Sequence, residues 1–211
     1  MDPWPEIHRQ RLAVAGLLDD LDSAEWSQPS LCAGWTVHDV AAHLTLQMLR
    51  LRDVPGMLRH WRGGMQATIA ETARLRAAQW APEQIVDYLR RTAGERRRNV
   101  GLTPMEPLID LLVHGQDIAL PLGRIHPVPP EAAAACAQRV LTMRFPPPQP
   151  SVRAVAGLRL SATDTAWSFG AGPEVCGPIA ALLLAVTGRT ALLSRLEGPG
   201  ARAFGQRLTT M

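Results

Sequence analysis

The feature that most limits how this chain can fold is an apolar stretch, residues 107–119, that contains three ionisable side chains. Asp110, His114 and Asp117 are spaced four and three residues apart. An α-helix has about 3.6 residues per turn, so the three groups lie on one helical face. Burying such groups costs free energy unless each has a partner. The stretch therefore predicts a core helix, and a carboxylate and an imidazole one turn apart suit a single metal ion.

A second helix with a strong start signal carries another histidine. Thr36 is a suitable N-cap and Asp39 follows three positions later, so we expect a capping box and a helix running to about Val54. His43 lies in the apolar part of this helix. Taken alone, His43 is more typical of a core residue than of a ligand, Asp110 fits a cap or an arginine partner, and Asp39 fits either the cap or a partner of His43.

The combination is more informative than each residue alone. Two apolar helices each present a histidine, and one of them adds a carboxylate one turn away. Metal sites in helical bundles are built in this way, from side chains on facing helices. Nitrogen and carboxylate ligands suit zinc, or nickel or iron less selectively, and three protein ligands leave a position open for water or substrate. The alternative is a structural bundle whose histidine and aspartate side chains pair with one another.

The chain as a whole is predicted to be mainly helical and to consist of two domains. The proline run at 145–150 forbids helix and favours an extended linker, so we expect a helical bundle at 1–145 and a small α+β domain at 151–211. The last helix of the bundle is predicted at 131–143, and a bundle helix at 81–99.

The second domain shows shorter, strand-like patterns. Apolar residues predict a strand at 152–162 with a bend at Gly157, a hairpin partner at 165–170, and helices at 179–187 and 201–208.

Composition excludes several classes of protein. The net charge of +3 comes from dispersed residues, and the run 96–98 is typical of a solvated helix face, so we expect no nucleic-acid partner. The longest apolar run, 179–186, is too short to cross a membrane. Three scattered cysteines, Cys32, Cys136 and Cys176, argue for a reducing cytoplasm, and the first residues do not resemble a signal peptide. We expect a monomer or a homodimer.

Two segments resemble a known family. Residues 31–44, LCAGWTVHDVAAHL, are similar to one signature of the mycothiol-dependent maleylpyruvate isomerase family, which belongs to the DinB-like metal-binding bundle superfamily. Residues 110–122 resemble the second signature, an acidic residue followed by His and Asp. Residues from Asp164 to Arg189 resemble the small carboxy-terminal domain of the family. The resemblance implies a DinB-like up-down four-helix bundle followed by a small α+β domain.

The resemblance also implies a metal site. Carried over by position, its ligands are His43, Asp110 and His114, and the metal is expected to be zinc or another divalent ion such as nickel. The isomerase has Glu where this chain has the shorter Asp110. Asp117 then has three possible roles: it can orient an imidazole, act as a fourth ligand, or form an ion pair with Arg124.

The implied activity depends on mycothiol as cosubstrate. In the isomerase the thiolate adds to a cis double bond, the bond rotates and the thiol leaves; other members are expected to transfer thiols to small electrophiles. Arg189 is the predicted catalytic residue for holding an anionic substrate, with Arg207 as a second possibility. The sequence pairs no histidine with Cys32, so it is not a predicted nucleophile, and His126 is predicted to be exposed. The alternative is a non-catalytic metal-binding bundle with a binding or stress-response role.

Overall fold

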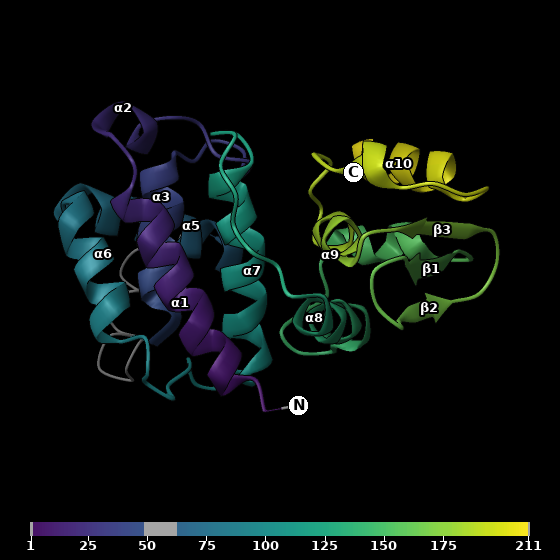
Figure 1. Ribbon diagram of the computed structural model, residues 1–211, viewed down its shortest axis with the longest axis horizontal. Coiled ribbons are helices and arrows are strands. Elements are labelled where there is room, and N and C mark those ends of the chain that lie inside the picture. Colours follow the sequence, from purple (N-terminus) through teal and green to yellow (C-terminus); the bar gives the residue numbers. More distant parts are fainter. Residues whose placement is uncertain (1, 49–62, 211) are drawn as a thin grey trace. The chain divides into compact units, whose positions relative to one another are not determined.

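The computed structural model describes residues 2–48 and 63–210 (Figure 1). The chain divides into two compact units, Met1–Pro127 and Val128–Met211. The predicted mainly helical architecture, a bundle followed by a small α+β domain, is confirmed. In the part of the chain that the structure describes, no helix is both long and apolar enough to cross a membrane.

The first unit is a bundle in which α1 packs against α6 and α7, while α3 packs against α5 and α7. Its described helices are α1 (Trp4–Asp19), α2 (Ser23–Trp26), α3 (Val37–Leu44), the 3-10 turn η1 (Thr45–Met48), α5 (Met65–Gln79), α6 (Pro82–Arg91) and α7 (Met105–Ala119).

Two bundle helices are shorter than predicted. The α-helix that starts after Thr36 ends at Leu44 and tightens into η1; its predicted continuation to Val54 lies outside the described residues. α6 ends at Arg91 instead of near residue 99, and the arginine run 96–98 follows it in an exposed segment without helix. That run therefore does not form a helix face.

Among the described helices of the bundle, α7 is the most buried, and this burial explains why its sequence is so apolar. Leu108, Leu111, Leu112 and Ile118 are each at most 1% exposed. Burial of such side chains contributes about 1.5–3 kcal/mol each. The polar side chains on this helix are therefore held by a rigid, close-packed scaffold.

The second unit is built around a three-stranded sheet with strand order β2-β1-β3. Its elements are α8 (Pro130–Thr142), the 3-10 helix η3 (Pro150–Val155), β1 (Arg159–Ala162), β2 (Ser168–Gly170), β3 (Glu174–Gly177), α9 (Ile179–Val186), η4 (Leu193–Arg195) and α10 (Ala201–Thr209). β1 pairs antiparallel with β2 and parallel with β3, with Leu160 opposite Phe169 and Val175. α9 packs against β1 and β3, and α10 against β3 and η3.

Two expectations about this unit differ from the structure. The helix predicted at the end of the bundle, α8, lies in the second unit because it packs against α9; the units divide after Pro127, not at 145–150. The first half of the strand predicted at 152–162 is η3, where buried Ser151 donates a hydrogen bond to the Val186 carbonyl. Gly157, with φ of +71°, then reverses the chain into β1.

Candidate metal centre

Helix α3 begins with the predicted capping box, which fixes the position of His43. The Thr36 N–H donates to Asp39 Oδ2 (2.9 Å), and the Asp39 N–H donates to Thr36 Oγ1 (3.2 Å). Asp39 therefore serves as the cap, which was one of its two predicted roles. His43 lies two turns into this helix, half-buried, with Trp35 edge-on at 5.5 Å between ring centroids.

The structure brings together the three side chains that the sequence singled out as ligands. One ligand atom from each of His43, Asp110 and His114 lies within 4.8 Å of the others, and all three residues are half-buried. The two imidazole rings meet edge to face with centroids 4.8 Å apart. Two helices, α3 and α7, thus place two nitrogens and one carboxylate oxygen at a common point.

This donor set fits a divalent metal such as zinc. Ligand atoms bound to one zinc ion at about 2.1 Å with tetrahedral angles lie about 3.4 Å apart. The separations of at most 4.8 Å exceed that value by at most about 1.4 Å, which small rotations of the side chains can close. The shorter arm of Asp110 therefore does not remove its carboxylate from the two histidines.

Asp117 fixes the orientation of the His114 imidazole by a hydrogen bond. Its side chain is fully buried, and Asp117 Oδ2 accepts a hydrogen bond of 2.8 Å from His114 Nδ1. Burial lowers the pKa of His114, but hydrogen bonds from Asp117 and Cys32 and the negative charge of Asp117 outweigh it and raise the pKa to about 10. With Nδ1 facing Asp117, Nε2 is the nitrogen that would bind a metal. The raised pKa keeps both ring nitrogens protonated at neutral pH in the metal-free protein, so a metal would have to displace the Nε2 proton. Arg124 pairs with Glu25 at 2.9 Å, not with Asp117.

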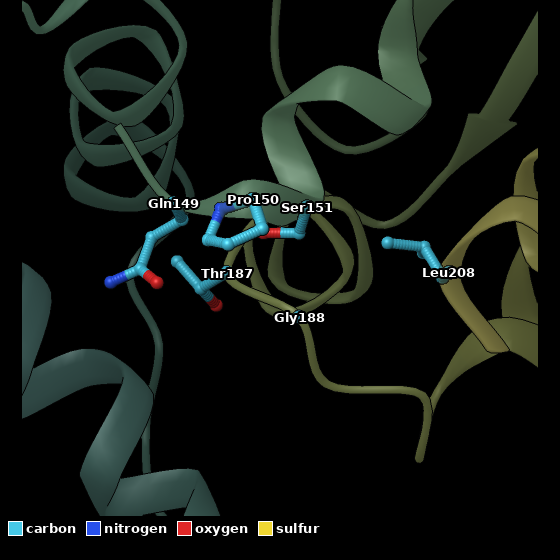
Figure 2. A pocket seen from close by; sticks show the side chains of 6 residues that line it. All are labelled: Gln149, Pro150, Ser151, Thr187, Gly188 and Leu208. Atoms are coloured by element: carbon cyan, nitrogen blue, oxygen red, sulfur yellow. The ribbon is translucent and has the colours of Figure 1, made fainter. Parts of the chain in front are cut away.

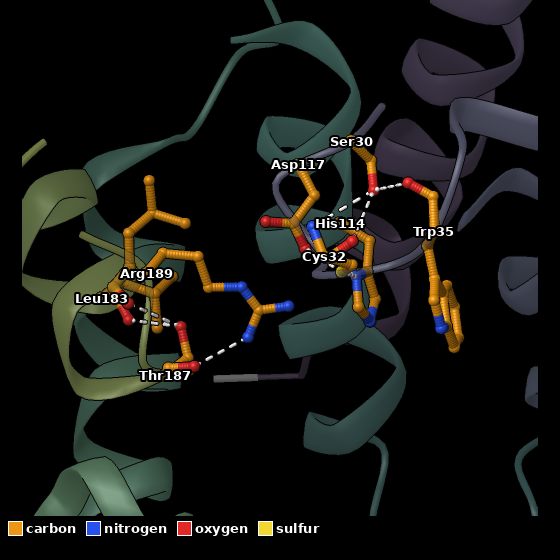
Figure 3. A network of polar contacts seen from close by, with 9 residues as sticks. Ser30, Cys32, Trp35, His114, Asp117, Leu183, Thr187 and Arg189 are labelled. Atoms are coloured by element: carbon orange, nitrogen blue, oxygen red, sulfur yellow. Dashed lines mark hydrogen bonds and ion pairs between the residues drawn. The ribbon is translucent and has the colours of Figure 1, made fainter. Parts of the chain in front are cut away.

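Cys32 lies beside His114 and Asp117, which the sequence did not predict. Its thiol donates to Asp117 Oδ2 at 3.1 Å and lies 3.7 Å from His114 Nδ1 (Figure 3). Cys32, His114 and Asp117 thus form a second group of donors within 4.8 Å of one another. A histidine 82 residues away in the chain cannot be paired with a cysteine by local spacing. The sequence offers one indication that Cys32 lies near the site, which is its position in the loop just before the capping box.

The loop that carries Cys32 is closed by its own hydrogen bonds. Ser30 Oγ donates to the Trp35 carbonyl (2.9 Å) and accepts from the Cys32 N–H (3.1 Å), while the Trp35 N–H donates to the Cys32 carbonyl (3.0 Å). The Leu31 N–H donates to the backbone carbonyl of Asp117 (3.1 Å). The loop is therefore attached to α7 before the chain enters α3.

His126 is buried, contrary to the prediction that it is exposed. His126 comes after α7 in the chain, and its ring lies against Gly115 of that helix. A Cβ added at Gly115 would come within 2.3 Å of the ring. His126 is 5% exposed, and among the described residues neither ring nitrogen makes a hydrogen bond of normal geometry. Burial lowers its pKa to about 4, although the backbone of Leu111 partly offsets the effect. His126 is thus a neutral core side chain that the proline-rich segment does not reveal.

In the second unit, both predicted arginines contact backbone carbonyls. Arg189 Nη1 donates to the Thr187 carbonyl (2.7 Å; Figure 3), and Arg207 Nη1 donates to the carbonyls of Ala154 and Ala156 (2.9 and 2.8 Å). Arg207 therefore closes the end of η3, which is a structural role.

A cavity of about 220 Å³ lies next to Arg189 in sequence (Figure 2). It is lined by Gln149, Pro150, Ser151, Thr187, Gly188 and Leu208. None of these side chains ionises, so the cavity offers a neutral, mixed polar and apolar surface.

Comparisons with known proteins agree with this architecture. Residues 7–101 match the family model described as the mycothiol maleylpyruvate isomerase N-terminal domain, a range that includes Thr36 and His43 and ends before Asp110. No curated protein matches the chain. Two crystal structures, of the mycothiol-dependent maleylpyruvate isomerase and of a histidine-to-alanine mutant of it, are 15% identical to this chain and cover 95% of it and 93% of their own chains, with TM-scores of 0.60 and 0.59. These structures show a shared fold. Residues 7–101 are therefore similar to the N-terminal domain of the mycothiol maleylpyruvate isomerase family, and the chain as a whole shares the fold of the two solved structures.

Proposed function

We propose that this protein is a metal-dependent enzyme that uses a low-molecular-weight thiol, mycothiol or a close analogue, to isomerise a small unsaturated acid or to transfer the thiol to a small electrophile. The observation that carries the proposal is the meeting of His43, Asp110 and His114 within 4.8 Å in a helical bundle whose residues 7–101 match the N-terminal domain model of the isomerase family. The reduced thiols of all three cysteines support a cytoplasmic location.

The proposed site holds a divalent metal, for which zinc is the best fit, through His43, Asp110 and His114. Bound there, it supplies positive charge that lowers the pKa of a thiol, so that the thiolate forms near neutral pH. Asp117 keeps the His114 ring in one orientation. Trp35 lies edge-on to His43, with ring centroids 5.5 Å apart, and places an apolar ring beside it.

The proposed isomerisation balances without an oxidant or a reductant. The thiolate sulfur forms a bond to one carbon of a cis double bond conjugated to a carbonyl, and the π electrons move toward the carbonyl oxygen. The remaining single bond rotates. The C–S bond then breaks, the double bond re-forms in the trans geometry, and the thiolate is released unchanged. In thiol transfer the new C–S bond is kept: an addition ends when the enolate carbon takes up a proton, and a substitution ends when the displaced group leaves with its bonding electrons.

Arg189 is proposed to bind the anionic group of the substrate. Its hydrogen bond to the Thr187 carbonyl orients the guanidinium, whose planar geometry suits a carboxylate. Replacing Arg189 with Ala should raise KM for an acidic substrate while metal content stays unchanged. An unchanged KM would remove Arg189 from the proposal.

One observation favours a second candidate, a non-catalytic metal-binding bundle with a binding or stress-response role. The isomerase has Glu at the position of Asp110, and the shorter side chain shifts the carboxylate by about one methylene. Metal binding without thiol-dependent turnover would support this candidate over the enzyme.

The direct test is metal content followed by turnover. Purified protein, reconstituted with zinc and desalted, is expected to contain about one metal ion per chain. His43→Ala and His114→Ala should each lower zinc affinity by more than the roughly 10–100-fold typical of residues that only support a ligand. His8→Ala, which replaces an exposed histidine on α1, is the matched control and should bind zinc like the wild type.

Three outcomes decide the proposal. Wild-type protein that binds no zinc refutes the metal site. Full affinity in either ligand variant refutes the assigned residues. If zinc binds, titration with mycothiol and turnover with a panel of unsaturated acids and electrophiles separate the enzyme from the non-catalytic alternative.

A further inference from the structure

The side chain of Cys32 is held in place by the backbone around it. The loop from Ser30 to Trp35 closes on itself, and the Leu31 N–H donates to the Asp117 carbonyl at 3.1 Å. The thiol therefore reaches Asp117 from a fixed position, as Figure 3 shows. A flexible side chain would lose rotational entropy on forming such a contact, whereas here the short cysteine arm loses little.

The thiol donates to the same carboxylate oxygen that holds His114. Asp117 Oδ2 accepts from Cys32 Sγ (3.1 Å) and from His114 Nδ1 (2.8 Å), and the Asp117 side chain is fully buried. A buried carboxylate needs hydrogen-bond donors, since losing one leaves a desolvated charge without a partner. Two donors that converge on one oxygen restrict rotation of the carboxylate, and so restrict the imidazole that it holds.

We propose that Cys32 is a positioning residue for the metal site: its thiol fixes the Asp117 carboxylate, which in turn orients the His114 imidazole so that Nε2 faces His43 and Asp110. The inference rests on the proposed function for the identity of the site. It extends that function by giving a role to a residue in the first family signature that supplies no ligand.

The loop that carries Cys32 also links the two ligand-bearing helices. The Cys32 loop leads directly into the capping box at Thr36, and His43 follows two turns later on α3. Asp117 and His114 lie on α7. The loop thus connects the start of α3 to the part of α7 that carries His114, which the proposed site pairs with His43.

The other chemical role open to Cys32 is ligation. Cys32, His114 and Asp117 could hold a metal of their own, but that metal would have to take His114 Nδ1 and break its 2.8 Å hydrogen bond to Asp117. The positioning role keeps this bond. The two roles predict different spectra and different double-mutant behaviour.

The main experiment compares zinc affinity in Cys32→Ala, Cys32→Ser and Cys176→Ala by competition with a chromophoric chelator. Removing a group that supports a ligand typically weakens metal affinity by about 10–100-fold. Cys32 is one hydrogen bond further from the metal than Asp117, so we expect zinc affinity to fall about tenfold in Cys32→Ala. The serine hydroxyl keeps a donor and should restore affinity to within about threefold. Cys176→Ala changes a half-buried thiol of the second unit and should bind like the wild type.

A double-mutant cycle tests whether Cys32 acts through Asp117. Cys32→Ala should weaken zinc binding in the wild-type background and have no further effect in the Asp117→Ala background. Equal effects in both backgrounds overturn the proposal. Wild-type zinc affinity in Cys32→Ala also overturns it. A thiolate-to-metal charge-transfer band in the cobalt(II)-loaded wild type that is lost in Cys32→Ala would overturn it as well, because that band identifies Cys32 as a ligand.

A readout on the metal-free protein separates this inference from the proposed function. The His114 Nδ1 proton, hydrogen-bonded to a buried carboxylate, should give a slowly exchanging, strongly downfield NMR signal in the wild type and in Cys32→Ser. In Cys32→Ala it should exchange faster. If the protein binds no metal, the proposed function fails, and this comparison alone decides the role of Cys32: an unchanged signal in Cys32→Ala refutes it. Thermal unfolding of each variant verifies that it is folded.

Discussion

Lowering the pH should destabilise this protein through His126, a histidine outside the proposed metal site. Burial lowers the pKa of His126 from 6.5 to about 4 in the folded chain. Between these values the unfolded chain binds a proton at His126 and the folded chain does not. The free energy of unfolding therefore falls as the pH decreases from 6.5 toward 4, and this contribution is fully present above pH 6.5.

The size of the effect follows from the two pKa values. A difference between 6.5 and about 4, at about 1.4 kcal/mol for each pH unit, gives a loss of up to about 3 kcal/mol. That is a large part of the 5–15 kcal/mol typical of natural proteins. The ring is only 5% exposed, so solvent screening removes little of it.

The assay is urea unfolding of the wild type and of His126→Leu at several pH values between about 4 and 7. Leucine has a similar volume and does not titrate. All other titrating groups are common to both proteins, so the difference between the two stability curves isolates His126. The wild type should lose about 3 kcal/mol relative to His126→Leu over this range. Parallel curves would refute the inference that the buried ring is neutral.

Other substitutions test packing and capping. Gly115→Ala should lower the free energy of unfolding by about 1–3 kcal/mol, because the new Cβ meets the His126 ring. Gly16→Ala, whose Cβ would lie in open space, should raise it by about 0.4–1 kcal/mol. Urea unfolding measures both. Arg11→Met should cost about 2–4 kcal/mol, since buried Arg11 donates to three carbonyls after α6; an unchanged midpoint would contradict this. Thr36→Ala should cost about 1 kcal/mol and weaken zinc binding.

The elements that local sequence specifies were predicted well. The capping box at Thr36 and Asp39 depends on residues three positions apart, and the structure contains both of its hydrogen bonds. The polar face of α7 depends on helical periodicity alone, and Asp110 and His114 do lie on one side of that helix, next to His43. Spacing of this kind is readable because an α-helix converts sequence separation directly into direction.

Features that depend on tertiary contacts were not predicted. α8 reads as a bundle helix, yet its apolar face packs against α9 of the second unit. Residues 150–155 carry apolar side chains at strand-like positions, but a hydrogen bond from Ser151 to the Val186 carbonyl, far along the chain, favours a 3-10 helix there. The burial of His126 depends on Gly115 of α7, which has no Cβ to meet the ring. In each case the deciding partner is remote in sequence.

The loop between α2 and α3 belongs to a recognisable motif, but the contacts that it makes cannot be predicted from the motif alone. Its Gly34 has φ of +73°, a left-handed conformation that favours glycine, so the turn before Trp35 is fixed locally. That turn directs the Leu31 N–H and the Cys32 thiol toward Asp117, 85 residues away. The sequence contains the turn signal but not its target. In the proposed site, the first signature contributes His43 as a ligand and its loop supports His114 on the other helix. Substitutions in this loop should therefore weaken metal binding without altering a proposed ligand.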